Sequence, residues 1–152
     1  MSGRYFVLYL IAVTKSSDIG AYTTGNLCHR LMPWDNHKIA PKLSPGKSWE
    51  GFFGGIAFSV AVALTIRHYF GDQMLINGNE VISVWVAVVT GAAFATLGFI
   101  GDVAESALKR ASGMKDSGNT IPGMGGVMDV VDSLILVSPL FYCILSAMIQ
   151  NS

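Results

Sequence analysis

The chain has 152 residues, of which 51% are hydrophobic and only 13% are charged. Soluble domains usually carry about 25% charged residues, so this composition excludes an ordinary soluble globule and a disordered chain. Ten basic and ten acidic residues give a formal net charge of zero. This balance gives no support to a nucleic-acid binder, because such proteins show a basic face.

Three runs of the sequence contain no Asp, Glu, Lys or Arg, and they predict membrane-spanning helices: residues 51–66, 81–101 and 133–152. A bilayer core about 30 Å thick needs about 20 mostly apolar helical residues. The middle run is long enough alone, and the other two reach this length with interfacial residues at their ends. A shorter apolar run, residues 5–13, is either the end of a longer helix or an interfacial segment. A signal peptide is disfavoured there because no small-residue cleavage site follows.

The predicted fold class is therefore an all-α, polytopic membrane helical bundle with about three to four transmembrane helices and two polar loops. The loops, residues 14–50 and 102–132, hold eight of the ten basic and eight of the ten acidic residues. With four crossings, both lie on one side, and the N-terminus, residues 67–80 and the C-terminus lie on the other. The positive-inside rule places the two loops in the cytoplasm, and an inner-membrane site facing the cytoplasm is expected.

Asp18 in the first loop follows an apolar run closely, where an unpaired carboxylate is costly. Two interpretations stay open. Asp18 is a helix-end cap or a partner for Lys15, or it is a carboxylate of a metal or phosphate site.

The stretch from Lys42 to Gly51 reads KLSPGKSWEG. Its Ser48 is placed to cap the helix that follows. Its Gly-Lys-Ser is similar to the end of a P-loop, but Pro41 stands where that motif needs Gly, and no strand is predicted before it. What remains is Lys47 beside the free N–H groups of a helix start, which is a generic anion site, or a lysine that only anchors the helix at the interface.

The second loop begins with four polar residues that share one helix face, Asp102, Glu105, Ser106 and Lys109. They form either a solvated turn with internal salt bridges or part of a site. Residues 113–126 hold a glycine-rich segment whose backbone can approach a ligand closely. Further on, Asp129 and Asp132 lie one turn apart at the predicted start of the last helix. Mg²⁺ prefers one or two carboxylates together with water and substrate phosphates, so the loop predicts metal-assisted phosphoryl chemistry.

Three blocks of the sequence, in order, resemble the phosphatidate cytidylyltransferases, also called CDP-diacylglycerol synthases. The first block is Asp18-Ile19-Gly20-Ala21-Tyr22, and the second is the KLSPGKSWEG stretch. The third is Ser106-x-Leu108-Lys109-Arg110-x4-Lys115-Asp116-x-Gly118-x2-Ile121-Pro122-Gly123-x-Gly125-Gly126-x2-Asp129-x2-Asp132. The resemblance spans roughly residues 5 to 145.

The resemblance implies the reaction of CTP with phosphatidate to CDP-diacylglycerol and pyrophosphate, with Mg²⁺ as cofactor. Asp102 and Asp129 are then expected as the metal carboxylates. With these two, the catalytic set has three basic residues: Lys109, Arg110 and Lys115. The expected substrate-binding residues are Asp18, Lys47, Ser48, Ser106, Asp116, Gly123, Gly125, Gly126 and Asp132. The expected partners are CTP, phosphatidate, membrane lipid and a second copy in a homodimer, with no nucleic acid.

Two positions depart from the family pattern. Met124 stands where the family has His, and Val130 where it has Arg, so a hydrogen-bonding group and a fixed positive charge are lost. The chain is expected to be one membrane domain, residues 1–152, forming the C-terminal catalytic part of an N-terminally truncated relative. The alternatives are a diverged, non-catalytic member that binds lipid or nucleotide, and a small ion transporter, which the placement of the acids at the membrane edge disfavours.

Overall fold

The computed structural model describes residues 3–31, 37–40, 44–76, 79–80, 82–113 and 127–150, and for residues 40, 44–45, 76, 79–80 and 127–132 it describes the backbone alone. Within these ranges the chain is mostly helical, in the order α1 (Gly3–Leu31), β1 (Lys38–Ala40), β2 (Ser44–Ser48), α2 (Trp49–Phe70), η1 (Gly71–Gln73), β3 (Leu75–Ile76), β4 (Asn79–Glu80), α3 (Val84–Ala111) and α4 (Val127–Gln150). The prediction of an all-α helical bundle is confirmed.

Three segments are long and apolar enough to cross a membrane: Trp49–Gln73, Val84–Ala111 and Ser133–Gln150. Each of them covers all or most of one charge-free run of the sequence, which confirms the predicted spans. Many large apolar side chains along these helices are exposed, as is typical of helices that face lipid.

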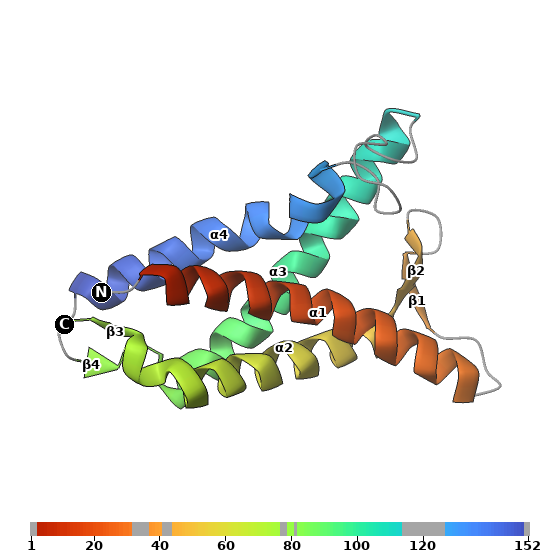
Figure 1. Ribbon diagram of the computed structural model, residues 1–152. Coiled ribbons are helices and arrows are strands. Elements are labelled where there is room, and N and C mark those ends of the chain that lie inside the picture. The colour runs from red at the N-terminus through yellow and green to blue at the C-terminus, as the bar shows by residue number, and fades with distance from the viewer. Residues whose placement is uncertain are drawn as a thin grey trace.

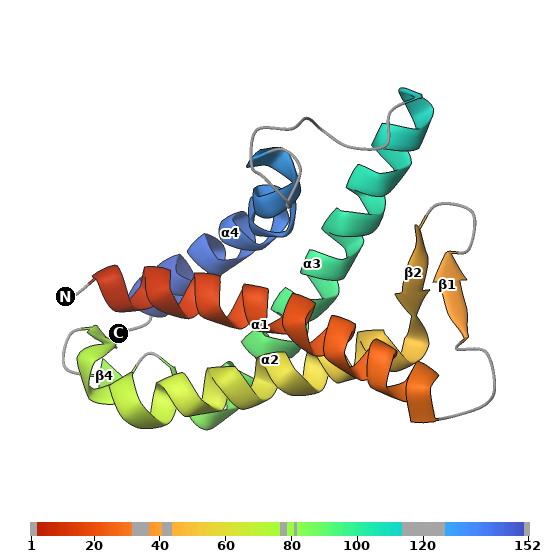
Figure 2. The same cartoon turned by 45° about the vertical axis from the view of Figure 1, so that its right-hand side comes forward.

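The helices are arranged so that the end of α3 and the start of α2 lie toward the same end of the bundle as the β1–β2 hairpin (Figures 1 and 2). Figure 1 shows the start of α1, the end of α4 and the β3–β4 hairpin at one end, and the β1–β2 hairpin at the other. Figure 2 shows the end of α3 rising above that hairpin, with α1 and α2 side by side along most of their lengths. Of the charged residues that the sequence assigned to one side, Arg30 in the last turn of α1, Lys47 of β2 and Glu50 in the first turn of α2 lie at the end with the β1–β2 hairpin.

Helix α1 is much longer than the apolar run from which it was predicted. Residues 14–31, expected as part of a loop, continue the helix to Leu31. Lys15 and Asp18 are the first charged residues after the apolar run. They lie one turn apart and form an ion pair, with Nζ and Oδ2 3.1 Å apart. The neighbouring hydroxyl of Ser17 donates to the carbonyl of Thr14 within the same helix, at 2.8 Å. Lys15, Ser17 and Asp18 therefore find partners within the helix that they continue.

The β1–β2 hairpin was not predicted, since no strand was expected before the Gly-Lys-Ser of residues 46–48, where Pro45 and Gly46 disfavour regular structure. Both lie within β2, which pairs antiparallel with β1. The register passes from Lys38 opposite Ser48 to Ala40 opposite Ser44, so two extra residues are accommodated in β2. A bulge of this kind is where a strand tolerates Pro and Gly. The hairpin leads directly into α2.

Helices α1 and α2 pack closely through small residues. A Cβ added at Gly51 would lie 2.9 Å from the carbonyl oxygen of Ala21, and one added at Gly55 would lie 2.9 Å from the carbonyl oxygen of Ser17. Each pair is spaced i, i+4, so a small-xxx-small face on each helix meets the other. Gly51 and Gly55 form a GxxxG pair, which allows this close packing of α2 on α1.

Buried polar contacts tie α1, α2 and α3 together at the level of the apolar core. Thr90 donates to the carbonyl of Val86 at 2.6 Å, so the 2.6 Å contact between Thr90 and Tyr9 uses the Tyr9 proton. The hydroxyl of Ser59 in α2 lies 3.1 Å from the carbonyl oxygen of Val13 in α1 and 2.8 Å from that of Gly91 in α3. One fully buried serine on α2 thus bridges its two neighbours.

Replacing Ser59 by alanine is expected to destabilise the bundle by about 0.6–1.7 kcal/mol, the range for hydrogen bonds between membrane helices. Unfolding of the detergent-solubilised chain measures the effect. Thr65→Val is the matched control, because the Thr65 hydroxyl bonds only to Ala61 of its own helix among the described residues. Equal stability of Ser59→Ala and the wild type would show that the bridge contributes nothing.

Candidate active site

A cavity of about 320 Å³ opens at the end of the bundle that carries the β1–β2 hairpin. Ligand pockets typically measure about 300–1,000 Å³. The residues lining it come from α1, β2, α2, α3 and the start of α4, and they include Lys15, Asp18, Lys47, Ser48 and Asp102. The two upstream sequence blocks and the carboxylate that ends the middle apolar run therefore meet in one place.

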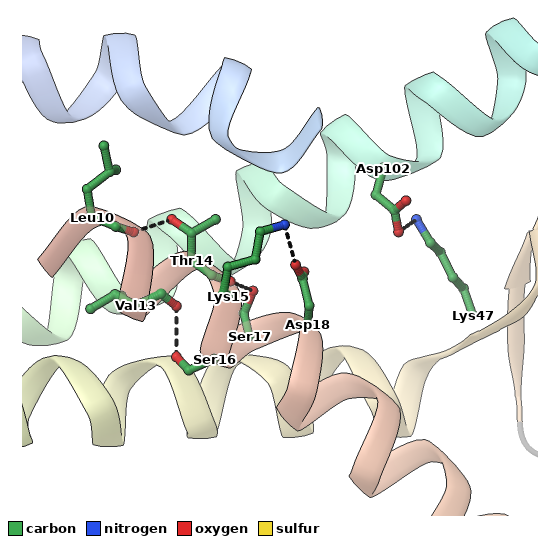
Figure 3. A network of polar contacts seen from close by, with 9 residues as sticks. All are labelled: Leu10, Val13, Thr14, Lys15, Ser16, Ser17, Asp18, Lys47 and Asp102. Atoms are coloured by element: carbon green, nitrogen blue, oxygen red, sulfur yellow. Dashed lines mark hydrogen bonds and ion pairs between the residues drawn. The ribbon is translucent and has the colours of Figure 1, made fainter. Parts of the chain in front are cut away.

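Lys47 and Asp102 form an ion pair across the cavity, with Nζ and Oδ2 2.5 Å apart (Figure 3). The Lys47 side chain is 14% exposed and that of Asp102 is 46% exposed. The Nζ atom of Lys47 is buried, yet it makes no well-aligned hydrogen bond to any atom in the described ranges. The contact is therefore mainly Coulombic, and the ammonium keeps donors for a ligand.

The second carboxylate of the cavity, Asp18, lies at mid-helix in α1 and pairs with Lys15 (Figure 3). The two interpretations of Asp18 therefore turn out to be compatible: it is a partner for Lys15, and it also lines the cavity. It does not cap a helix end. Two cations and two carboxylates thus share one cavity, so an anion and a cation could each find partners there.

Ser48 caps α2 as predicted, with its Oγ accepting from the backbone N–H of Gly51 at 3.2 Å. The N–H of Trp49 donates to the carbonyl of His37 at 3.0 Å. Two of the first-turn donors are thus already used, so the helix start is a weaker anion site than the sequence suggested. The Lys47 ammonium is the stronger attraction for an anion.

The hairpin is fastened to α2 by Glu50 in its first turn. Oε1 of Glu50 accepts from the backbone N–H of His37 at 3.3 Å and lies 3.1 Å from its Nδ1. This contact holds His37, the residue before β1, against the first turn of α2, which follows Lys47 and Ser48 directly in the chain.

The polar face predicted on the helix after Asp102 exists, but it lies outside the cavity. Glu105 and Lys109 pair at 3.0 Å and are 11% and 18% exposed. Lys109 thus has an internal partner, as the salt-bridge interpretation predicted. Ser106 is half-buried and Arg110 is exposed, and neither lines the cavity.

The remaining predicted site residues lie outside what the structure describes. Lys115, Asp116, Gly123, Gly125 and Gly126 belong to residues 114–126, which fall between the described ranges. Asp129 and Asp132 lie in the first turns of α4, as expected, but their side chains are not described. The predicted pairing of Asp102 with Asp129 stays a prediction.

The lining residues that the sequence interpretation missed include Phe52, Phe99 and Ser133. Each was counted as part of an apolar run. A signal was available for Phe99, because it precedes Asp102 by three residues and shares its helix face. Ser133 follows Asp129 by four residues in the same way.

The donor chemistry of the cavity suits a hard cation. Among the described residues, no three His, Cys, Asp or Glu side chains gather as a metal site. Mg²⁺, however, needs only one or two protein carboxylates when substrate phosphates and water complete its shell. Asp102 and Asp18 line the same cavity, so the residues present fit such an ion.

Helices that span a membrane, with a charged cavity at one end of the spans, define an integral membrane protein with a site for an ionic ligand. The chain belongs to the Cytidylyltransferase family, whose profile matches residues 1–148. The resemblance found in the sequence is thereby confirmed.

Individual relatives agree with this membership. A phosphatidate cytidylyltransferase of Haemophilus influenzae is 37% identical over 139 residues, covering 91% of this chain and 45% of that protein. One of Staphylococcus epidermidis is 34% identical over 143 residues, covering 94% and 50%. The uncharacterized protein YnbB of Escherichia coli is 39% identical over 140 residues, covering 92% and 42%. The chain therefore spans about half the length of the relatives it matches.

Proposed function

We propose that the chain carries the catalytic part of a phosphatidate cytidylyltransferase, which converts CTP and phosphatidate to CDP-diacylglycerol and pyrophosphate. The observation that supports this most directly is the shared cavity, where Asp18, Lys47 and Asp102 meet although they are far apart in the sequence. Two of the relatives are named phosphatidate cytidylyltransferases, which supports the same reaction.

The chemistry is a direct nucleotidyl transfer. A phosphate oxygen of phosphatidate attacks the α-phosphorus of CTP and forms a new P–O bond. The bond between the α-phosphorus and the bridging oxygen breaks, and pyrophosphate leaves with the electron pair. Because the lipid phosphate is ionised at neutral pH, no strong general base is needed, and the protein contributes alignment and charge neutralisation.

The residues of the cavity divide into two roles. Lys47 holds a phosphate of CTP or of the lipid, and Ser48 lies beside it. Asp102 holds Mg²⁺, with Asp18 near the same site and Asp129 as the second carboxylate. Helix periodicity supports the last assignment, because position 129 shares a face of α4 with Ser133, which lines the cavity. When bound, Mg²⁺ supplies neutralisation of the triphosphate and of the leaving pyrophosphate.

The remaining predicted residues act from the segment that follows α3. Lys109, Arg110 and Lys115 contact phosphates, which requires Lys109 to release Glu105. Ser106, Asp116 and Asp132 are binding residues at the edge of the same site, and Gly123, Gly125 and Gly126 bring the backbone against phosphate oxygens. Residues 14–50 and 102–132 hold eight of the ten basic residues, which supports a cytoplasmic location for this end of the bundle, with the chain in the inner membrane. Two copies of the chain form a homodimer.

A second candidate is a non-catalytic member that binds lipid or nucleotide. Met124 and Val130 favour it, since each removes a polar group that the family pattern has. Substituting Met124→His and Val130→Arg together distinguishes the two, because the appearance of activity only in that double variant supports the non-catalytic reading.

The experiment that tests the proposed function is incorporation of radiolabelled CTP into lipid by the purified chain in detergent. We expect label in the lipid product only when phosphatidate and Mg²⁺ are both present, and loss of product on addition of EDTA. Asp129→Ala is expected to abolish product formation in a folded chain. Full product formation by that variant would remove Asp129 from the metal site, and absence of product from the wild type and the double variant would reject the proposed activity.

A further inference from the structure

The ammonium group of Lys47 touches two side chains of α3. Its Nζ contacts the carboxylate of Asp102 and also lies 4.8 Å from the centroid of the Phe99 ring. Phe99 and Asp102 are three residues apart, so one face of α3 presents both a carboxylate and a ring to the same cation. Lys47 comes from β2, and this contact therefore connects the hairpin to α3.

The ring of Phe99 is held in place by its own neighbours. It packs against Phe52 of α2 with centroids 4.9 Å apart and an interplanar angle of 60°. Phe52 in turn packs edge to face against Trp49, with centroids 6.1 Å apart. The position of the ring is thus fixed by α2, independently of Lys47 or Asp102.

A bound ligand affects the contact of Lys47 with Asp102 differently from its contact with the Phe99 ring. Under the proposed function, Asp102 binds a cation and Lys47 binds a phosphate, so the ion pair between them must open. A lysine without a counter-ion regains the freedom of its long side chain and moves toward water. The attraction between an ammonium and an aromatic face does not depend on Asp102 and persists when the pair opens.

We infer that Phe99 is a positioning residue, whose ring keeps the Lys47 ammonium inside the cavity so that Lys47 can exchange Asp102 for a ligand phosphate. This role deepens the proposed function and rests on it. The ring contacts the lysine and acts on the ligand through it.

Binding of CTP and of inorganic pyrophosphate to the detergent-solubilised chain tests the inference, measured by calorimetry. Phe99→Leu keeps an apolar side chain but removes the aromatic face, and we expect it to weaken pyrophosphate binding by about fivefold to tenfold. Phe99→Tyr keeps the face and is expected to bind within about twofold of the wild type. Phe58→Leu is the matched control, because Phe58 is 48% exposed and does not line the cavity.

A double-mutant cycle separates positioning from a general packing effect. In a Lys47→Met chain, Phe99→Leu should change pyrophosphate binding no further. The same loss in both backgrounds, or no loss in the single variant, would overturn the inference. If the cycle behaves as expected with pyrophosphate but CTP binds no more tightly than pyrophosphate, the positioning role stands and the proposed nucleotide function fails. If the wild type binds neither ligand, both fail.

Discussion

Replacing Asp102 by asparagine is expected to slow CTP-dependent formation of CDP-diacylglycerol by about 10²–10³-fold. Asparagine has the same shape but no charge, so it can neither hold a divalent cation well nor balance Lys47. A loss of this size corresponds to about 2.7–4 kcal/mol of transition-state stabilisation, which is typical for removing one electrostatic contact from an active site. The initial rate of label transfer from CTP to lipid measures it.

Two controls separate loss of chemistry from loss of fold. Asp72→Asn removes an exposed carboxylate from η1, at the opposite end of the bundle, and should leave the rate unchanged. Asp102→Asn also leaves the mostly buried Lys47 without its counter-ion, which costs stability. Combining Asp102→Asn with Lys47→Met removes the uncompensated charge, so stability should return while activity does not. A rate within twofold of the wild type for Asp102→Asn would exclude Asp102 from the reaction.

The sequence could predict those parts of the site that depend on local pattern. Ser48 is read as a helix cap because its side chain bonds a backbone group three residues away. The charge-free runs give the spans because a helix in lipid must be apolar along most of its length. Gly51 and Gly55 indicate close packing because a helix repeats its face every four residues. Each of these features depends on one continuous stretch of the chain.

Contacts between segments far apart in the sequence could not be predicted from the sequence pattern. Nothing in the sequence links Lys47 to Asp102, since their meeting depends on how the hairpin folds against α3. The helix over residues 14–31 was predicted as part of a loop, because the charges of Lys15 and Asp18 follow the apolar run. The ion pair between these two side chains was not considered. The ring of Phe99 was hidden in an apolar run, where a side chain that faces lipid and one that faces a lysine look the same.

Adding side chains at Gly55 is expected to destabilise the contact between α1 and α2. Alanine in the middle of a helix is normally favoured over glycine by about 0.8–1.0 kcal/mol. At Gly55, however, a Cβ would lie 2.9 Å from the carbonyl oxygen of Ser17 and 3.3 Å from the Cβ of Ala21. A backbone oxygen inside a helix cannot turn aside, so α1 must shift as a body, and overpacking of this kind typically costs about 1–3 kcal/mol. We therefore expect a net loss for Gly55→Ala and a larger one for Gly55→Leu.

Unfolding of the detergent-solubilised variants, followed by circular dichroism, measures the two losses. Gly71→Ala is the matched control, because Gly71 has helical angles and no atom within 4 Å of an added Cβ. It should be neutral or slightly stabilising, so the sign of the effect separates steric contact from helix propensity. Since Gly55 also lines the cavity, Gly55→Leu should weaken pyrophosphate binding at temperatures where the chain is still folded. A Gly55→Ala chain as stable as the wild type would mean that α1 and α2 are held together by other contacts, and that their separation can adjust without moving Asp18 relative to Lys47.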